Sequence, residues 1–134
     1  MEQTSRTGSP TVPRALGRTT WAIAEGYIPP ESNGPPEMLS HETACLLNTS
    51  GRDANVRITI YFSDRDPIGP FHVVVPARRT VHLRFNDLSD PASIPRGTDY
   101  SSVFESDVPI IVQHTRLDSR QSAAALLSTM AYAE

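Results

Sequence analysis

Val75-Pro-Ala-Arg-Arg-Thr-Val-His-Leu-Arg-Phe-Asn-Asp87 is the stretch of the sequence that says most about the fold. Within it, apolar and polar side chains alternate with the two-residue period of a β-strand, whose successive side chains point to opposite faces. The apolar set, which we expect to face a core, is Val81, Leu83 and Phe85. The opposite set is Thr80, His82, Arg84 and Asn86. These groups bind anions, hydroxyls or acidic partners, so the second face predicts a binding surface built on a sheet.

Similar runs recur along the chain and predict an all-β fold. The clearest is Val56-Arg-Ile-Thr-Ile-Tyr-Phe-Ser63, where apolar residues alternate with polar ones or tyrosine. The predicted strands are Thr19–Ala24, Glu42–Asn48, Val56–Ser63, Phe71–Val75, Thr80–Asn86, Ser101–Glu105, Ile110–Leu117 and Leu126–Ala131. About eight short strands, with prolines confined to the connections, favour an antiparallel, jelly-roll-like β-sandwich or a small barrel. For Ser119–Leu127, which is rich in helix formers, a short helical turn is the alternative.

The length and composition restrict the organisation of the chain. With 134 residues it has the size of one domain. Residues 1–17 are rich in Thr, Ser, Gly, Pro and Arg, which predicts a disordered leader, and residues 18–134 form the predicted β-sandwich domain. No run of apolar residues is long enough to span a bilayer, and the N-terminus lacks the apolar core of a signal peptide. We therefore expect a cytoplasmic protein without membrane insertion.

The charged residues and the single cysteine exclude several classes of site. All twelve basic residues are arginines, yet the net charge is -3 and the pI is near 5.8, which argues against a dedicated nucleic-acid binder. Cys45 lies in an apolar run and predicts a buried structural thiol, since one cysteine forms neither an intrachain disulfide nor a cysteine-rich zinc site. The four histidines are His41, His72, His82 and His114, and none is in a metal-binding spacing.

The sequence contains no nucleophile elbow, phosphate-binding glycine loop or zinc-protease motif. We therefore predict a protein that is not an enzyme and that uses no metal or cofactor. A metal-dependent hydrolase or isomerase of barrel type is the enzymatic alternative.

Polar side chains on two predicted strands suggest a ligand site. Ile110–Gln121 repeats the combination of histidine and arginine after an apolar start. If it shares a sheet with Thr80–Asn86, then His82, Arg84, His114 and Arg116 form one cationic patch. The arginines would donate to ligand oxygens, the histidines would tune orientation or pH response, and Glu25 and Glu42 would accept hydroxyls. The full predicted ligand site is Trp21, Glu25, His41, Glu42, Arg79, His82, Arg84, Asn86, His114, Arg116 and Asp118.

Five motifs in these regions resemble those of the soluble sensory rhodopsin transducer family, whose domain is described as Anabaena sensory rhodopsin transducer-like. They are Trp21–Pro30, Ser40–Thr43, Val75–Thr80, Arg84–Leu88 and Val112–Gln121, and the resemblance covers about Gly17 to Ala133. It implies a small all-β sandwich that assembles as a homotetramer. It also implies a cytoplasmic signalling role downstream of a membrane photoreceptor, with binding of sugar-like or other small polar molecules, or of DNA.

Two functional hypotheses follow. The first is a non-enzymatic sensing or signalling module whose Arg and His face binds a small polar ligand, a microbial rhodopsin or another subunit. The alternative is a transcriptional regulator that contacts DNA through arginines repeated around a tetramer.

Overall fold

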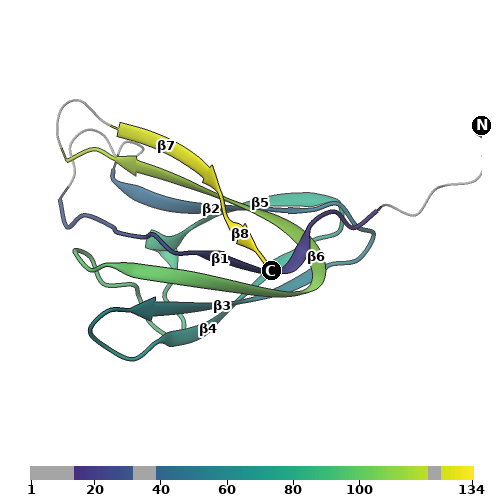
Figure 1. The fold of residues 1–134 in the computed structure, drawn as a ribbon, viewed down its shortest axis with the longest axis horizontal. Coiled ribbons are helices and arrows are strands. Elements are labelled where there is room, and N and C mark those ends of the chain that lie inside the picture. The colour runs from purple at the N-terminus through teal and green to yellow at the C-terminus, as the bar shows by residue number, and fades with distance from the viewer. Residues whose placement is uncertain (1–13, 32–38, 121–124) are drawn as a thin grey trace, which may run out of the picture.

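The computed structural model describes residues 14–31, 39–120 and 125–134, which form β-strands and one 3-10 turn (Figure 1). The predicted all-β class is confirmed. No helix in these ranges is long and apolar enough to cross a membrane. The elements are β1 (Arg18–Ile23), β2 (His41–Asn48), β3 (Ala54–Phe62), β4 (Ile68–Val75), β5 (Arg79–Arg84), η2 (Phe85–Asp87), β6 (Tyr100–Asp118), β7 (Ala125–Met130) and β8 (Tyr132–Ala133).

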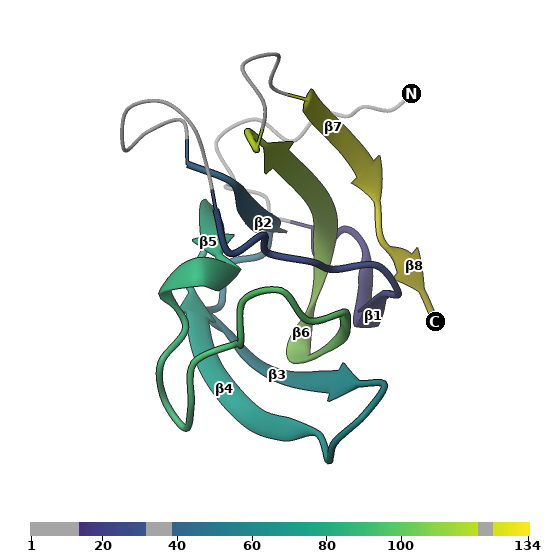
Figure 2. The ribbon, with the colours of Figure 1, turned by 90° about the vertical axis from the view of Figure 1, so that its left-hand side faces the viewer.

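Strand β6 belongs to two antiparallel sheets and joins them. Sheet I has the order β4-β3-β6-β1-β8, and sheet II has the order β5-β2-β6-β7. The first half of β6 pairs with β1 and β3, whereas the second half pairs with β2 and β7. Figure 2 shows β6 rising from the level of β3 toward β7. The predicted antiparallel sandwich is confirmed, with β6 passing from one sheet to the other.

The sequence predicts two strands where the structure has the single 19-residue strand β6. The predicted break falls at Asp107-Val-Pro109, which lie outside the pairing registers of both sheets. There the backbone stays extended, and the hydroxyl of Ser106 accepts from the Val108 N–H at 3.3 Å and donates to its carbonyl at 2.6 Å. A proline suits this junction because no ladder partner needs its missing N–H.

The core lies between the sheets and follows the predicted alternation. In β3, Val56, Ile58 and Ile60 are buried, whereas Arg57 and Tyr61 are exposed. The aromatic members of the core are Trp21, Phe71, Phe85, Tyr100 and Phe104.

The stretch that includes β5 alternates as predicted as far as Arg84. Val81 and Leu83 are half-buried, while His82 is exposed. The strand then ends, and η2 places Phe85 in the core, with its ring centroid 5.6 Å from that of Tyr100 and 6.2 Å from that of Phe104. The predicted strand is therefore two residues too long, because a buried aromatic ends it in a turn.

Two predictions fall partly on residues that the structure does not describe. Of the predicted leader, residues 1–13 lie outside the described ranges, and the division into leader and domain stays a prediction. The helical alternative covers residues 121–124, which are also outside them. Its described C-terminal part, Ala125 to Leu127, belongs to the strand β7.

Candidate functional site

Glu42 of β2 is a fully buried carboxylate that faces the interior of the sandwich. Pairing of β2 with β6 places Arg116 opposite Glu42 and His114 opposite Ala44, so both basic side chains lie beside it. Its Oε1 contacts His114 Nε2, and its Oε2 accepts from Arg116 Nε at 2.6 Å and from the Tyr27 backbone N–H at 3.0 Å. A buried charge is costly unless it is paired and hydrogen-bonded, and these contacts meet that need.

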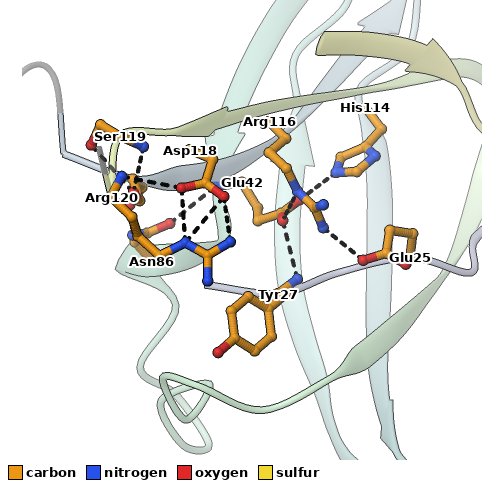
Figure 3. Close-up of polar contacts among 10 residues, drawn as sticks. Glu25, Tyr27, Glu42, Asn86, His114, Arg116, Asp118, Ser119 and Arg120 are labelled. Carbon is orange, nitrogen blue, oxygen red and sulfur yellow. Dashed lines mark hydrogen bonds and ion pairs between the residues drawn. The ribbon is translucent and has the colours of Figure 1, made fainter. Parts of the chain in front are cut away.

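Arg116 extends this buried group toward the surface (Figure 3). Its Nη2 donates to Glu25 Oε2 at 2.8 Å, and the Glu25 side chain is 67% exposed. Partial burial by itself would lower the pKa of Arg116, but the hydrogen bonds to Glu25 and Glu42 raise it above the ordinary value. One arginine therefore links an interior carboxylate to an exposed one.

The segment after β1 carries Glu25 and is anchored at several points. The Gly26 carbonyl accepts from Tyr100 N at 2.9 Å, and the Ile28 carbonyl accepts from Gly97 N at 2.7 Å. Gly26 lies directly on the Tyr100 ring, and any Cβ at this position would overlap the ring atoms. The glycine therefore permits the close approach that positions Glu25 over Arg116.

The Tyr100 hydroxyl is buried near the same network. It has no hydrogen-bond partner among the described residues. Burial, and next the negative charge of Glu42, raise the pKa of Tyr100 well above its ordinary value. The phenol is therefore neutral, and its hydroxyl is an unused polar group in the core.

Asn86 fixes the start of β2 and hence the position of Glu42. Its Oδ1 accepts from Glu42 N at 3.2 Å, and its Nδ2 donates to the Ser40 carbonyl at 3.0 Å. The Ser40 hydroxyl in turn accepts from Ser119 N at 2.9 Å, just after the end of β6. These contacts hold η2, β2 and β6 together.

Asp118 pairs with Arg120, beyond the buried network. The Arg120 Nη2 to Asp118 Oδ2 distance is 2.7 Å, and the guanidinium lies over the Tyr27 ring at 5.7 Å. The hydrogen bonds from Arg120 lower the pKa of Asp118. This ion pair thus packs against the segment whose backbone N–H binds Glu42.

A surface cup of about 340 Å³ lies next to Glu25. Its polar and aromatic lining consists of Glu25, Tyr61, Phe62, Ser63, Asp99, Tyr100 and Ser101. Carboxylates and hydroxyls beside aromatic rings are the groups that bind small polar molecules with several hydroxyls. In the described part of the chain, no group of three or more His, Cys, Asp or Glu residues is arranged to hold a metal ion.

The structure brings together about half of the predicted ligand residues. Glu25, Glu42, His114 and Arg116 form one network, which Asn86 supports through the backbone of Glu42. Asp118 lies beside it, paired with Arg120.

The predicted single cationic patch of His82, Arg84, His114 and Arg116 is wrong. Cys45 pairs with His82 and Gln113, whereas Ala44 pairs with Leu83 and His114. Directly paired residues share a face, so His82 and Arg84 lie on the outer face of sheet II and His114 and Arg116 on the inner face. The sequence contained a signal for these opposite faces. His114 and Arg116 continue the two-residue series of the apolar Ile110 and Val112, whereas His82 and Arg84 alternate with the apolar Val81 and Leu83.

The other predicted ligand residues lie apart from the network. Trp21 is a core residue whose Nε1 donates to the carbonyls of Arg18 and Ile110 at 3.0 and 2.9 Å. His41 Nδ1 contacts the Leu39 carbonyl at 2.7 Å, and Arg79 is exposed at the beginning of β5.

Several residues of the site were not predicted from the sequence. Tyr27 acts through its backbone N–H, which no side-chain pattern reveals. Arg120 and Ser119 follow β6, and the Asp118-Ser-Arg120 spacing was an available signal. Tyr100 and Asp99 reach the site only because the loop before β6 folds back onto the segment after β1.

Comparison with known proteins identifies the family. The family model of the Anabaena sensory rhodopsin transducer matches residues 16–133. Among solved structures, the Anabaena sensory rhodopsin transducer is 63% identical, with a TM-score of 0.71, over 76% of this chain and 99% of that one. The crystal structure of Thermotoga maritima 1070 is 34% identical, with a TM-score of 0.79, over 88% of this chain and 96% of that one. None of the curated proteins matches the chain.

The matched residues include every strand that the structure describes and the whole network around Glu42. The predicted resemblance is therefore confirmed, and it supports a signalling role of the transducer type. The chain belongs to the Anabaena sensory rhodopsin transducer family.

Proposed function

We propose that this chain is a non-enzymatic, cytoplasmic signalling module that carries the signal of a microbial rhodopsin as a homotetramer. The observation that carries the proposal is the 63% identity over 99% of the Anabaena transducer chain. Calorimetric titration with a detergent-solubilised microbial sensory rhodopsin tests it, with a proton-pumping rhodopsin as the control. We expect saturable heat with the sensory protein alone. Equal heats for both rhodopsins, or none beyond dilution, would refute it.

The cup beside Glu25 is the proposed site for a small, sugar-like ligand that modulates this signal. Glu25 both lines the cup and accepts from Arg116, so a ligand that bonds to Glu25 competes with this ion pair. Arg116 in turn holds Glu42, whose other contacts include the backbone of Tyr27. This arrangement supports a module in which occupancy of the cup changes how the segment after β1 is held.

Titration with a panel of sugars and polyols tests the cup, using Glu25→Gln and the matched control Glu31→Gln. Glu31 is an exposed carboxylate of the same segment that does not line the cup. A lost hydrogen bond to a charged group weakens binding by about tenfold or more. We expect this loss for Glu25→Gln, and no change for Glu31→Gln or for Arg84→Ala on the outer face. If Arg84→Ala removes binding and Glu25→Gln does not, the ligand binds elsewhere.

The exposed apolar surface of β7 supports the proposed assembly. Within this edge strand Leu126 is 70% exposed and Met130 is 55% exposed, and no charged residue interrupts it. Such edges are protected in stable proteins, here by a proposed contact between subunits. Sedimentation equilibrium should give the mass of four chains and a lower mass for Met130→Asp. Val74→Asp, at the exposed apolar Val74 of β4, an edge strand of sheet I, should leave the mass unchanged.

A further inference from the structure

Five exposed arginines lie at the end of the sandwich opposite the cup, and we call this surface the arginine end. They are Arg14, Arg18, Arg52, Arg78 and Arg79. Arg18 begins β1 and Arg79 begins β5, while Arg52 and Arg78 lie in the β2–β3 and β4–β5 turns. These segments meet at the right of Figure 1, and β1 and β3 lead from them toward the cup.

Asn48, which is fully buried, holds the two turns of the arginine end together. Its Nδ2 donates to the Arg52 carbonyl at 2.7 Å and to the Val75 carbonyl at 3.0 Å. Its Oδ1 accepts from Ser50 N at 3.0 Å, and the Ser50 carbonyl accepts from Arg78 N at 3.1 Å. The backbone that carries Arg52, Arg78 and Arg79 is therefore fixed before any partner binds.

The N-terminal arginines are attached to the same turns. Leu16 N donates to Thr49 Oγ1 at 2.9 Å, and the Thr49 hydroxyl contacts the Arg14 carbonyl. Leu16 itself is 39% exposed between the two arginines. The arginine end thus combines cations with one exposed apolar side chain.

Arg78 adopts a conformation that arginine rarely takes. Its φ is 55°, in the left-handed region where glycine and asparagine are favoured. Non-glycine residues in this region persist at turns and functional sites because the surrounding structure holds them there. The backbone of Arg78 is held by Ser50, and its exposed side chain is available to a partner, which a charged binding surface explains.

The cations of the arginine end are not neutralised within the described part of the chain. None of the five arginines forms an ion pair there. Two carboxylates lie nearby: Asp53 accepts from Ala77 N at 2.9 Å, and Asp107 of β6 accepts from Asn55 N at 2.8 Å. Both keep their negative charge, but the five arginines outnumber them. A chain with a net charge of -3 therefore has one end that is locally positive.

We propose that the arginine end binds the surface of an anionic lipid bilayer. Exposed cations on three short segments at one end of the molecule can contact an array of lipid phosphates, and each arginine near such a surface contributes to binding. No aromatic side chain is present at residues 14–18, 48–53 or 76–79 for nucleic-acid bases to stack on. A long nucleic acid bound at the arginine end would extend past it, and the net negative charge of the rest of the chain would repel it. The inference rests on the proposed function in one respect: a chain that binds a membrane photoreceptor works next to a bilayer.

Cosedimentation with vesicles tests the proposal, using phosphatidylcholine alone or mixed with phosphatidylserine at several salt concentrations. The test variant is Arg52→Gln with Arg79→Gln. The matched control is Arg57→Gln with Arg65→Gln, which removes the same charge from exposed arginines outside the arginine end. We expect binding only to the anionic vesicles, weakening as salt rises. The test variant should bind about thirtyfold more weakly, which corresponds to about 1 kcal/mol for each arginine.

Equal binding to neutral vesicles, or equal loss in both double variants, would overturn the proposal. So would tighter binding to a DNA duplex than to anionic vesicles at the same salt, because the partner would then be a nucleic acid. Circular dichroism of both variants checks that the fold is kept. No rhodopsin is present in these measurements, so their failure is distinct from failure of the proposed signalling role.

Discussion

Replacing the buried Glu42 by glutamine removes one charge from the network and keeps its shape. The glutamine oxygen can still accept from Arg116 and Tyr27, and its amide nitrogen can still contact His114 Nε2. The main loss is the buried ion pair with Arg116, whose side chain is only 22% exposed. Removing one partner of a buried pair costs about 3 kcal/mol, because Arg116 stays largely buried and keeps only the exposed Glu25 as a charged partner. For a chain of this length we expect the melting temperature to fall by about 9 °C.

Urea unfolding followed by circular dichroism measures this loss. The control is Glu105→Gln, which breaks the ion pair with Arg57, whose side chains are 51% and 58% exposed. Such an exposed pair contributes about 0.5 kcal/mol or less. In the double variant Glu42→Gln with Arg116→Gln, the cost should be smaller than the sum of the two single costs. Equal effects of Glu42→Gln and Glu105→Gln would show that the buried network does not stabilise the fold.

Gly26→Ala should lower the free energy of unfolding by about 2 kcal/mol, because its Cβ overlaps the Tyr100 ring; a neutral result in urea unfolding would contradict this close contact. Tyr100→Phe removes a buried hydroxyl without a partner in the described residues, so stability should stay equal or rise by about 1 kcal/mol; a clear loss would show that the hydroxyl has a partner. The lowered pKa of Asp118 means that its pairing with Arg120 stabilises the fold above the unfolded pKa of about 4 and is lost as pH falls through the folded pKa. Asp118→Asn should therefore show a weaker loss of stability below about pH 4, measured by thermal melts; an acid profile identical to that of the unaltered chain would count against the pairing.

The all-β class was predictable because its signals are local. In β3 the alternation of Val56, Ile58 and Ile60 with Arg57 and Tyr61 is a property of the strand itself, and burial follows it. The end of β5 was not predictable in the same way. Phe85 continues the apolar series, yet it reaches the core from a 3-10 turn, since the Tyr100 and Phe104 rings against which it packs lie on β6.

The sequence predicted several residues of the candidate site, but it did not predict how they are arranged. Glu42 was predicted as a hydroxyl acceptor and Arg116 as a donor to ligand oxygens, and in the structure they face each other across β2 and β6. The cup depends on contacts between loops far apart in the chain, such as the bridge between Tyr27 and Asp99, and no periodicity reports them. The register of β2 with both β5 and β6 places His82 on the outer face of sheet II. The cationic patch was predicted from residue types alone, so it combined residues from the two opposite faces of this sheet.

The two sheets share β6, and this has a consequence for biosynthesis. Residues 100–118 supply the pairing partner of β1, β2, β3 and β7, yet they are translated after the first three of these strands. Until β6 leaves the ribosome, β1 has no neighbour in either sheet, and β2 and β3 pair only with β5 and β4. Long-range pairing of this kind is slow because loop closure precedes any stabilising contact. Folding of the nascent chain is therefore completed only after β6 has been made, and until then the exposed hairpins are substrates for chaperones.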